Sequence, residues 1–180
     1  MQCKTAVILA VFLVAGQCFA REITKEFGTF SVPDTFVETK KFSTPDKPFY
    51  VSQEDEAALA SGKFKFVNNI SVSKGKNKYT KENHFEFRQA ILRQLAFQCS
   101  VSGFSISGGG YHSKSGYVVY KFVLSPCEEL LEKRPQEPTT TQYYIVSEDY
   151  SYVLVHETAR GDAADTDAAA DMIVETFCTQ

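Results

Sequence analysis

The side chains that could carry out chemistry are few, and they do not form a recognised catalytic or metal-binding pattern. The three histidines, His84, His112 and His156, lack the i, i+4 spacing with which a helix presents two zinc ligands. The sequence also has no HExxH, CxxC or GxSxG motif, the patterns of metalloproteases, thiol redox sites and serine hydrolases. We therefore predict that the protein is not an enzyme and uses no cofactor or metal ion.

The first 20 residues predict secretion. Lys4 is followed by an apolar run over residues 6–15 and by small residues before a cleavage point after Ala20, which is the pattern of a secretory signal peptide. No later stretch approaches the roughly 18 apolar residues that a membrane-spanning helix needs. We expect a secreted, extracellular protein in which residues 21–180 form a single β-rich domain.

Three cysteines would remain after this cleavage, and the oxidising compartment predicts a disulfide bond. We expect one intramolecular disulfide and one leftover thiol, which is either buried or available to link two chains in a dimer. The spacing leaves all three pairings open. Cys178 lies near the C-terminus, so pairing it with Cys99 or Cys127 would fix that end of the chain to the domain, and we favour these two pairings.

Charge and composition narrow the classes of partner. Once Lys4 is removed from the 19 basic side chains, 18 remain against 22 acidic ones, and the net charge is −4. This balance argues against nucleic acid or an anionic membrane as the main partner. The 15 phenylalanines and nine tyrosines suit a β-rich core or a cavity lined with rings. Asn69 opens an N-glycosylation sequon, which predicts a glycan on a solvent-exposed segment.

Residues 116–160 carry the strongest strand signals, because they are dense in Val, Ile and Tyr and are bounded by Gly, Pro and Asp. The runs TQYYIVS and YVLVHET, joined by an acidic turn at 148–151, predict an antiparallel hairpin. Phe64 and Phe66 share one face of a strand predicted over 63–75. Alternation places a second apolar set on one face of the strand 116–125: Val118, Tyr120, Phe122 and Leu124.

Two segments predict helices. Residues 80–98 favour a helix with Phe87, Ile91 and Leu95 in one stripe, although the alternation of Phe85 with Phe87 leaves a strand open. Residues 162–178 are typical of an amphipathic helix with aspartates in its first half. Between these segments, the alternation of residues 97–107 predicts a strand. The run Gly108–Gly110 should end this strand and begin a flexible loop. Residues 21–50 fit either two short strands or an irregular arm.

The hairpin turn also carries a likeness to a known family. The residues Asp149-Tyr150-Ser151-Tyr152 resemble the TDYxxY loop of the lipocalins, with Glu148 in place of Thr and one residue fewer between the tyrosines. The resemblance covers the last third of the chain. It implies an eight-stranded barrel that holds one small apolar ligand.

Two fold classes and two functions follow. The first fold is mainly β, an antiparallel barrel or strongly curved sheet with a C-terminal helix, and it would bind a small hydrophobic molecule or lipid. The alternative is an α+β fold with a helix packed on an antiparallel sheet, acting as a non-catalytic interaction or inhibitor domain of cystatin type. A helix over 80–98 favours the second, and a strand there favours the first. The predicted ligand lining is Phe64, Phe66, Val118, Tyr120, Phe122 and Leu124.

Overall fold

The structure is a computed structural model that describes residues 19–62, 66–75, 82–147, 150–159 and 163–179. The predicted signal sequence up to Cys18, Phe64 and the acidic turn at 148–149 lie outside the described residues. Within the described part, none of the helices is long and apolar enough to cross a membrane.

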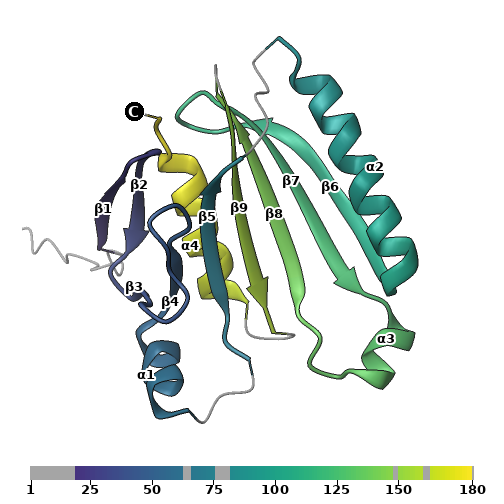
Figure 1. The fold of residues 1–180 in the computed structure, drawn as a ribbon, viewed down its shortest axis with the longest axis horizontal. Helices are drawn as coiled ribbons and strands as arrows, with labels where there is room; N and C mark the ends of the chain where they lie inside the picture. The colour runs from purple at the N-terminus through teal and green to yellow at the C-terminus, as the bar shows by residue number, and fades with distance from the viewer. Residues whose placement is uncertain (1–18, 63–65, 76–81, 148–149, 160–162, 180) are drawn as a thin grey trace, which may run out of the picture.

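The chain alternates short strands with helices of very different lengths (Figure 1). In chain order the elements are β1 (Ala20–Lys25), β2 (Gly28–Pro33), β3 (Phe36–Glu38), β4 (Phe49–Ser52), α1 (Gln53–Ser61), β5 (Asn69–Lys74), α2 (His84–Ser102), β6 (Phe104–His112), β7 (Val118–Pro126), α3 (Glu128–Lys133), β8 (Thr139–Val146), β9 (Ser151–Thr158) and α4 (Ala164–Thr176).

Seven strands form one open antiparallel sheet in the order β3-β4-β5-β9-β8-β7-β6, and β1 and β2 form a separate hairpin. Because β3 and β6 lie at opposite ends and do not pair with each other, the sheet is not closed. The predicted barrel is therefore wrong. The predicted alternative, an α+β fold with a helix packed on an antiparallel sheet, is confirmed.

The predicted hairpin between the two Tyr- and Val-rich runs is confirmed as β8 and β9. These strands pair antiparallel from Val146↔Ser151 to Thr139↔Thr158. The Ser147 hydroxyl and backbone N–H both bond to the Tyr150 carbonyl oxygen, at 2.8 and 2.9 Å, and so fix the start and end of the turn.

One face of the sheet is covered by α4 together with the β1–β2 hairpin. The predicted C-terminal helix is confirmed, and Ala169 and Ile173 on its inner face are fully buried. Phe177, just after α4, packs its ring against Phe30 of β2 and Tyr152 of β9, with ring centroids 6.3 and 4.8 Å apart. The helix thus joins the hairpin to the sheet.

The opposite face is covered in part by α2. Residues 80–98 are helical from His84 onward, as the favoured prediction held, and Phe87 and Leu95 are buried against the sheet. Phe87 meets the Tyr144 ring of β8 edge-on, with centroids 5.5 Å apart. A smaller cluster of Val51, Leu59 and Val67 packs α1 near the other end of the sheet.

The strand predicted over 97–107 is wrong in its first half, because α2 continues to Ser102 and ends at Gly103 in a left-handed cap. The predicted glycine loop is also wrong, since Gly108–Gly110 lie inside β6. Gly108 has a φ of 153°, and a Cβ there would lie 2.1 Å from the Lys121 carbonyl oxygen. A Cβ on Gly110 would lie 2.8 Å from the Tyr120 ring. The glycines therefore allow close packing in a strand.

The predicted disulfide is wrong, because Cys99, Cys127 and Cys178 are all free thiols. Cys99 is buried on the α2 face of the sheet, whereas Cys178 pairs with β2 on the α4 face, so the sheet lies between them. The C-terminus is fixed instead by two backbone hydrogen bonds between Thr29 and Cys178, each 2.8 Å long.

The glycosylation sequon does not face solvent as predicted. Asn69 begins β5 and is only 6% exposed. Its Nδ2 group donates hydrogen bonds to the Val67 carbonyl oxygen and to Glu157, both at 3.2 Å. A glycan on this nitrogen would have to displace both acceptors from a buried strand.

Replacement of Phe177 tests how strongly the C-terminal segment stabilises the fold. We expect Phe177→Ala to lower the free energy of unfolding by about 3–5 kcal/mol, because a fully buried ring leaves a cavity between β2 and β9. Urea denaturation followed by circular dichroism measures this. Phe85→Ala on the outside of α2, where the ring is 60% exposed, is the control and should change stability by less than about 0.5 kcal/mol. Equal losses would contradict the assignment.

Candidate functional site

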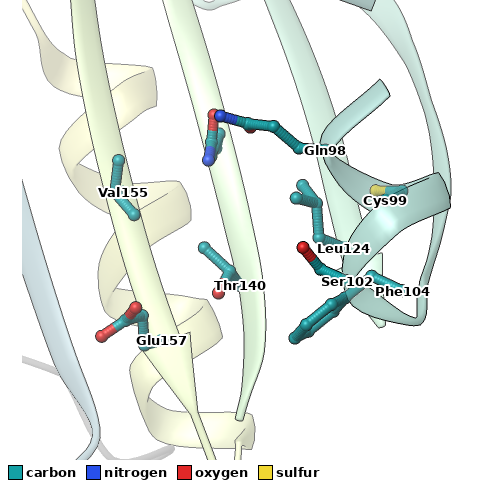
Figure 2. Close-up of a pocket in the computed structure, with 9 residues that line it drawn as sticks. Gln98, Cys99, Ser102, Phe104, Leu124, Thr140, Val155 and Glu157 are labelled. Carbon is teal, nitrogen blue, oxygen red and sulfur yellow. The ribbon is translucent and has the colours of Figure 1, made fainter. Parts of the chain in front are cut away.

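A hollow of about 390 Å³ lies beside the C-terminal end of α2, on the face of the sheet that α2 covers only in part (Figure 2). The end of α2 forms one wall, and β6, β7, β8 and β9 supply the rest. The lining residues are Gln98, Cys99, Ser102, Phe104, Leu124, Thr140, Gln142, Val155 and Glu157.

Side chains of β8 and β9 form the floor of the hollow. Along the face of β8 that is turned toward α2, the side chains change from polar Thr140 and Gln142 to Tyr144 and Val146. The last two are buried under the helix, and the first two are half-buried. The change from apolar to polar side chains on one face marks where the helix no longer covers the strand.

Two exposed apolar side chains lie on the outside of α2, near the end of the helix that borders the hollow. Phe97 and Val101 are both 69% exposed, and their i, i+4 spacing places them on one side of the helix. Val101 is also three residues beyond Gln98, which lines the hollow, so the two are neighbours on the helix surface. On this side the hollow is bordered by the polar side chain of Gln98, and the exposed apolar pair lies beyond it on the outside of α2.

Two polar groups are held in place at the hollow. The Tyr144 hydroxyl donates a 2.6 Å hydrogen bond to the Gln142 side-chain oxygen. Among the described residues, none accepts a hydrogen bond from the Gln142 amide nitrogen, which is left as a donor for a ligand. The Glu157 carboxylate accepts from Asn69 at 3.2 Å, so it is an oriented acceptor at the opposite end of the lining.

These groups suit the binding of a ligand. Cys99 is the one strong nucleophile type in the lining, and burial raises the pKa of its thiol. A neutral thiol is a poor nucleophile, and the lining holds no histidine or lysine that could activate it. The arrangement offers the apolar side chains of Phe104, Leu124 and Val155 together with amide donors and a carboxylate acceptor.

The structure brings one of the predicted lining residues to this hollow. Leu124 lines it, whereas Val118, Tyr120 and Phe122 pack under α2 with Phe87 as a solid core. Phe66 is half-buried in the segment before β5. Phe64 lies outside the described residues. The predicted alternation of the four β7 side chains is confirmed, but three of them pack against α2.

Most of the lining was missed by sequence reasoning. Gln98 was the last residue of the predicted helix 80–98, but Ser102 was assigned to the strand 97–107, so the continuation of the helix along the hollow was missed. Val155 and Glu157 lie on a strand that was predicted. The sequence did not predict which part of the sheet α2 covers, so it did not show that these two residues stay uncovered. The change along one face of β8, from Thr140 and Gln142 to Tyr144 and Val146, was a signal that could have identified this surface.

A second polar cluster lies on the opposite face, between α4 and the sheet. Asp171 of α4 accepts a 2.7 Å hydrogen bond from the Tyr143 hydroxyl and pairs with Lys121 at 3.3 Å. His156 is 1% exposed, and its Nδ1 lies 3.5 Å from the Asp167 carboxylate. Within the described part of the chain, neither nitrogen of the His156 ring has a hydrogen-bond partner.

Electrostatics keep this histidine neutral. Burial, and to a smaller extent the nearby Lys121, lower the pKa of His156 to about 4, and Asp171 opposes the shift. Burial also raises the pKa of Asp167. For Tyr143, burial and its hydrogen bond to Asp171 raise the pKa of the hydroxyl. The cluster therefore connects α4 to β7, β8 and β9, and several of its side chains are neutral.

Comparison with solved structures identifies the fold. The chain is similar to the Ran-binding protein Mog1p of Saccharomyces cerevisiae, with a TM-score of 0.50 and 13% identity over 90% of this chain and 96% of that chain. It is also similar to cyanobacterial PsbP from Synechocystis, with a TM-score of 0.48 and 11% identity over 93% and 96%. A mutant form of Mog1 gives 0.49 and 13% over 89% and 96%.

The likeness to Mog1p extends over nearly the whole of both chains and shows a shared α+β fold. The predicted likeness to lipocalins is therefore wrong. The turn at 148–151 carried that likeness, and it joins two central strands of an open sheet. No known protein family and no curated protein matches the sequence.

Acid should destabilise the protein through His156. The unfolded imidazole takes up a proton near pH 6.5, and the folded one only near pH 4. The free energy of unfolding should therefore fall as the pH drops from about 6.5 to about 4, by at most about 3 kcal/mol. The raised pKa of Asp167 offsets part of this loss, because the folded carboxyl takes up its proton more readily.

His156→Phe is the variant that tests this, because the ring nitrogens it removes have no hydrogen-bond partners among the described residues. Urea denaturation at a series of pH values should give a shallower loss of stability below pH 6.5 than in the parent protein. An unchanged slope would mean that other groups cause the acid sensitivity.

The free thiols should differ in reactivity. Under native conditions a thiol reagent should label the exposed Cys178 at least about tenfold faster than the buried Cys99, whose pKa is raised. Peptide mapping by mass spectrometry measures the two rates, and labelling in denaturant provides the control. Equal native rates, or a disulfide found before labelling, would contradict the structure.

Proposed function

We propose that the protein is a non-catalytic, secreted interaction domain that binds a segment of a partner protein at the hollow beside α2. The observation that carries this proposal is that the end of α2 that borders the hollow also exposes Phe97 and Val101. A small molecule inside the hollow would leave these two side chains in water. A partner chain can place one apolar side chain in the hollow and cover both of them.

The polar groups of the site fit a peptide segment. The free donor of Gln142 suits a backbone carbonyl group of the partner, and the Glu157 carboxylate suits an N–H group. Phe104, Leu124 and Val155 supply the apolar contact. An apolar anchor surrounded by a few hydrogen bonds is the usual anatomy of a protein interface.

The comparison structures support the class of function without naming a partner. The yeast neighbour is described as a Ran-binding protein, so a chain of this fold binds another protein. At 13% identity the likeness concerns the fold, and Ran is not proposed as a partner here. The helix found over residues 84–102 also favours the interaction domain over a barrel-shaped carrier.

A carrier for a small apolar molecule is the second candidate. The hollow of about 390 Å³ is within the range of about 300–1,000 Å³ that small-molecule sites occupy. Phe104, Leu124 and Val155 would contact such a ligand. The two candidates differ in whether the exposed side chains of α2 matter for binding.

Site-specific crosslinking tests the proposal. A photo-crosslinking amino acid in place of Gln98 should form an adduct with a protein, both in cells that make the chain and in their medium. The same amino acid in place of Ala57, which is exposed on α1, should not. Mass spectrometry of the adduct gives its mass and identity.

Matched variants show whether the adduct depends on the proposed surface. Phe97→Glu with Val101→Glu should reduce the protein adduct at least about tenfold, since two apolar contacts are replaced by charges. Phe85→Glu, at an exposed phenylalanine elsewhere on α2, should leave it unchanged. No adduct, or one that resists Phe97→Glu with Val101→Glu, would overturn the interaction domain. A small-molecule adduct would favour the carrier.

A further inference from the structure

The two edges of the main sheet differ in how well they are protected. Edge strand β3 has three residues, and the β1–β2 hairpin covers it. There Arg21 donates a 2.5 Å hydrogen bond to the Phe36 carbonyl oxygen, and Lys25 pairs with Glu38 at 2.7 Å. The other edge strand, β6, has nine residues and pairs only with β7 among the described strands.

Strand β6 lacks the features that keep a strand edge from pairing. Its sequence FSISGGGYH holds no lysine, arginine, aspartate, glutamate or proline. Natural edge strands are usually short, charged or covered, because their free N–H and C=O groups can pair with another chain. Phe104 and Ile106 of β6 pack toward α2, whereas Ser105, Ser107 and the three glycines of the strand are exposed.

We propose that the β6 edge pairs antiparallel with the β6 edge of a second copy of this chain, forming a two-fold symmetric dimer with one continuous sheet. The outward-facing side chains near the edge are serine and glycine, which provide no pockets to select a foreign peptide. Strand addition to a foreign peptide takes its specificity from such pockets. A symmetric copy needs none, because each contact occurs twice.

Steric and electrostatic features fit this occupant. In an antiparallel pair centred on Gly108, Ser107 of each copy faces Gly109 of the other, and Ile106 faces Gly110. A Cβ on Gly109 would meet no atom within 4 Å, so there is room for a neighbouring side chain. Because β6 has no lysine, arginine, aspartate or glutamate, these side chains do not place like charges opposite each other across the contact.

Oligomeric state tests the proposal. Size-exclusion chromatography with light scattering, over a series of concentrations, should show a dimer of the purified chain. Ser107→Lys combined with Gly109→Lys places like charges opposite each other twice, and we expect the dimer dissociation constant to rise at least about 100-fold. The control is Ala57→Lys with Ala60→Lys, at two exposed α1 positions, which should leave the dimer intact.

Hydrogen exchange locates the contact. Amides of β6 should exchange more slowly in the parent protein than in the edge variant at the same concentration, while β8 amides should not differ. Circular dichroism shows whether the edge variant is folded. A monomer at all concentrations, or a dimer that the edge lysines leave intact, would overturn the proposal. A β6 edge occupied by another protein would leave the purified chain monomeric and would also overturn it.

Discussion

The packing of Phe177 between the β1–β2 hairpin and the main sheet is the contact on which the architecture depends. The ring is fully buried and contacts Phe30 of β2, Tyr152 of β9 and Tyr117 just before β7. The two-stranded hairpin has too little apolar surface to be stable alone. Its attachment through Phe177 and through the Thr29–Cys178 hydrogen bonds makes the first and last parts of the chain one layer.

This layer explains why the two faces of the sheet are so different. On the α4 face, a helix and a hairpin together exclude water, and even polar groups such as His156 are buried there. On the other face, α2 covers one part of the sheet and α1 another, and β9 between them is left partly exposed. The hollow at Gln142 and Val155 is the consequence, because no element of the described chain covers that surface.

The two proposed surfaces use different parts of this asymmetry. The hollow beside α2 offers side chains of mixed character, with apolar contacts and oriented hydrogen-bonding groups, which suits a selective partner. The β6 edge offers backbone groups with little side-chain chemistry, which suits a copy of the same chain. They lie on a sheet face and a sheet edge, so one molecule could use both at once.

Local patterns in the sequence determined a good part of the elements. Period-two alternation is a property of the strand itself, so the hairpin of β8 and β9 and the inward face of Val118 to Leu124 were predictable. The stripe of Phe87, Ile91 and Leu95 likewise predicted the helical part of α2, and the aspartate-rich C-terminal segment predicted α4.

Tertiary structure alone decided whether the sheet would close and where its gaps would lie. Closure depends on the pairing of strands that are far apart in sequence, and β5 lies between β4 and β9, which no local pattern encodes. The sequence allowed a disulfide between Cys99 and Cys178, but the sheet lies between these two residues. The sequence of Gly108–Gly110 predicted a loop, but these residues lie inside a strand. There the close approach of Lys121 and Tyr120 leaves no room for a side chain at Gly108 and Gly110. In each case the deciding quantity is a distance between remote residues, which a one-dimensional pattern does not contain.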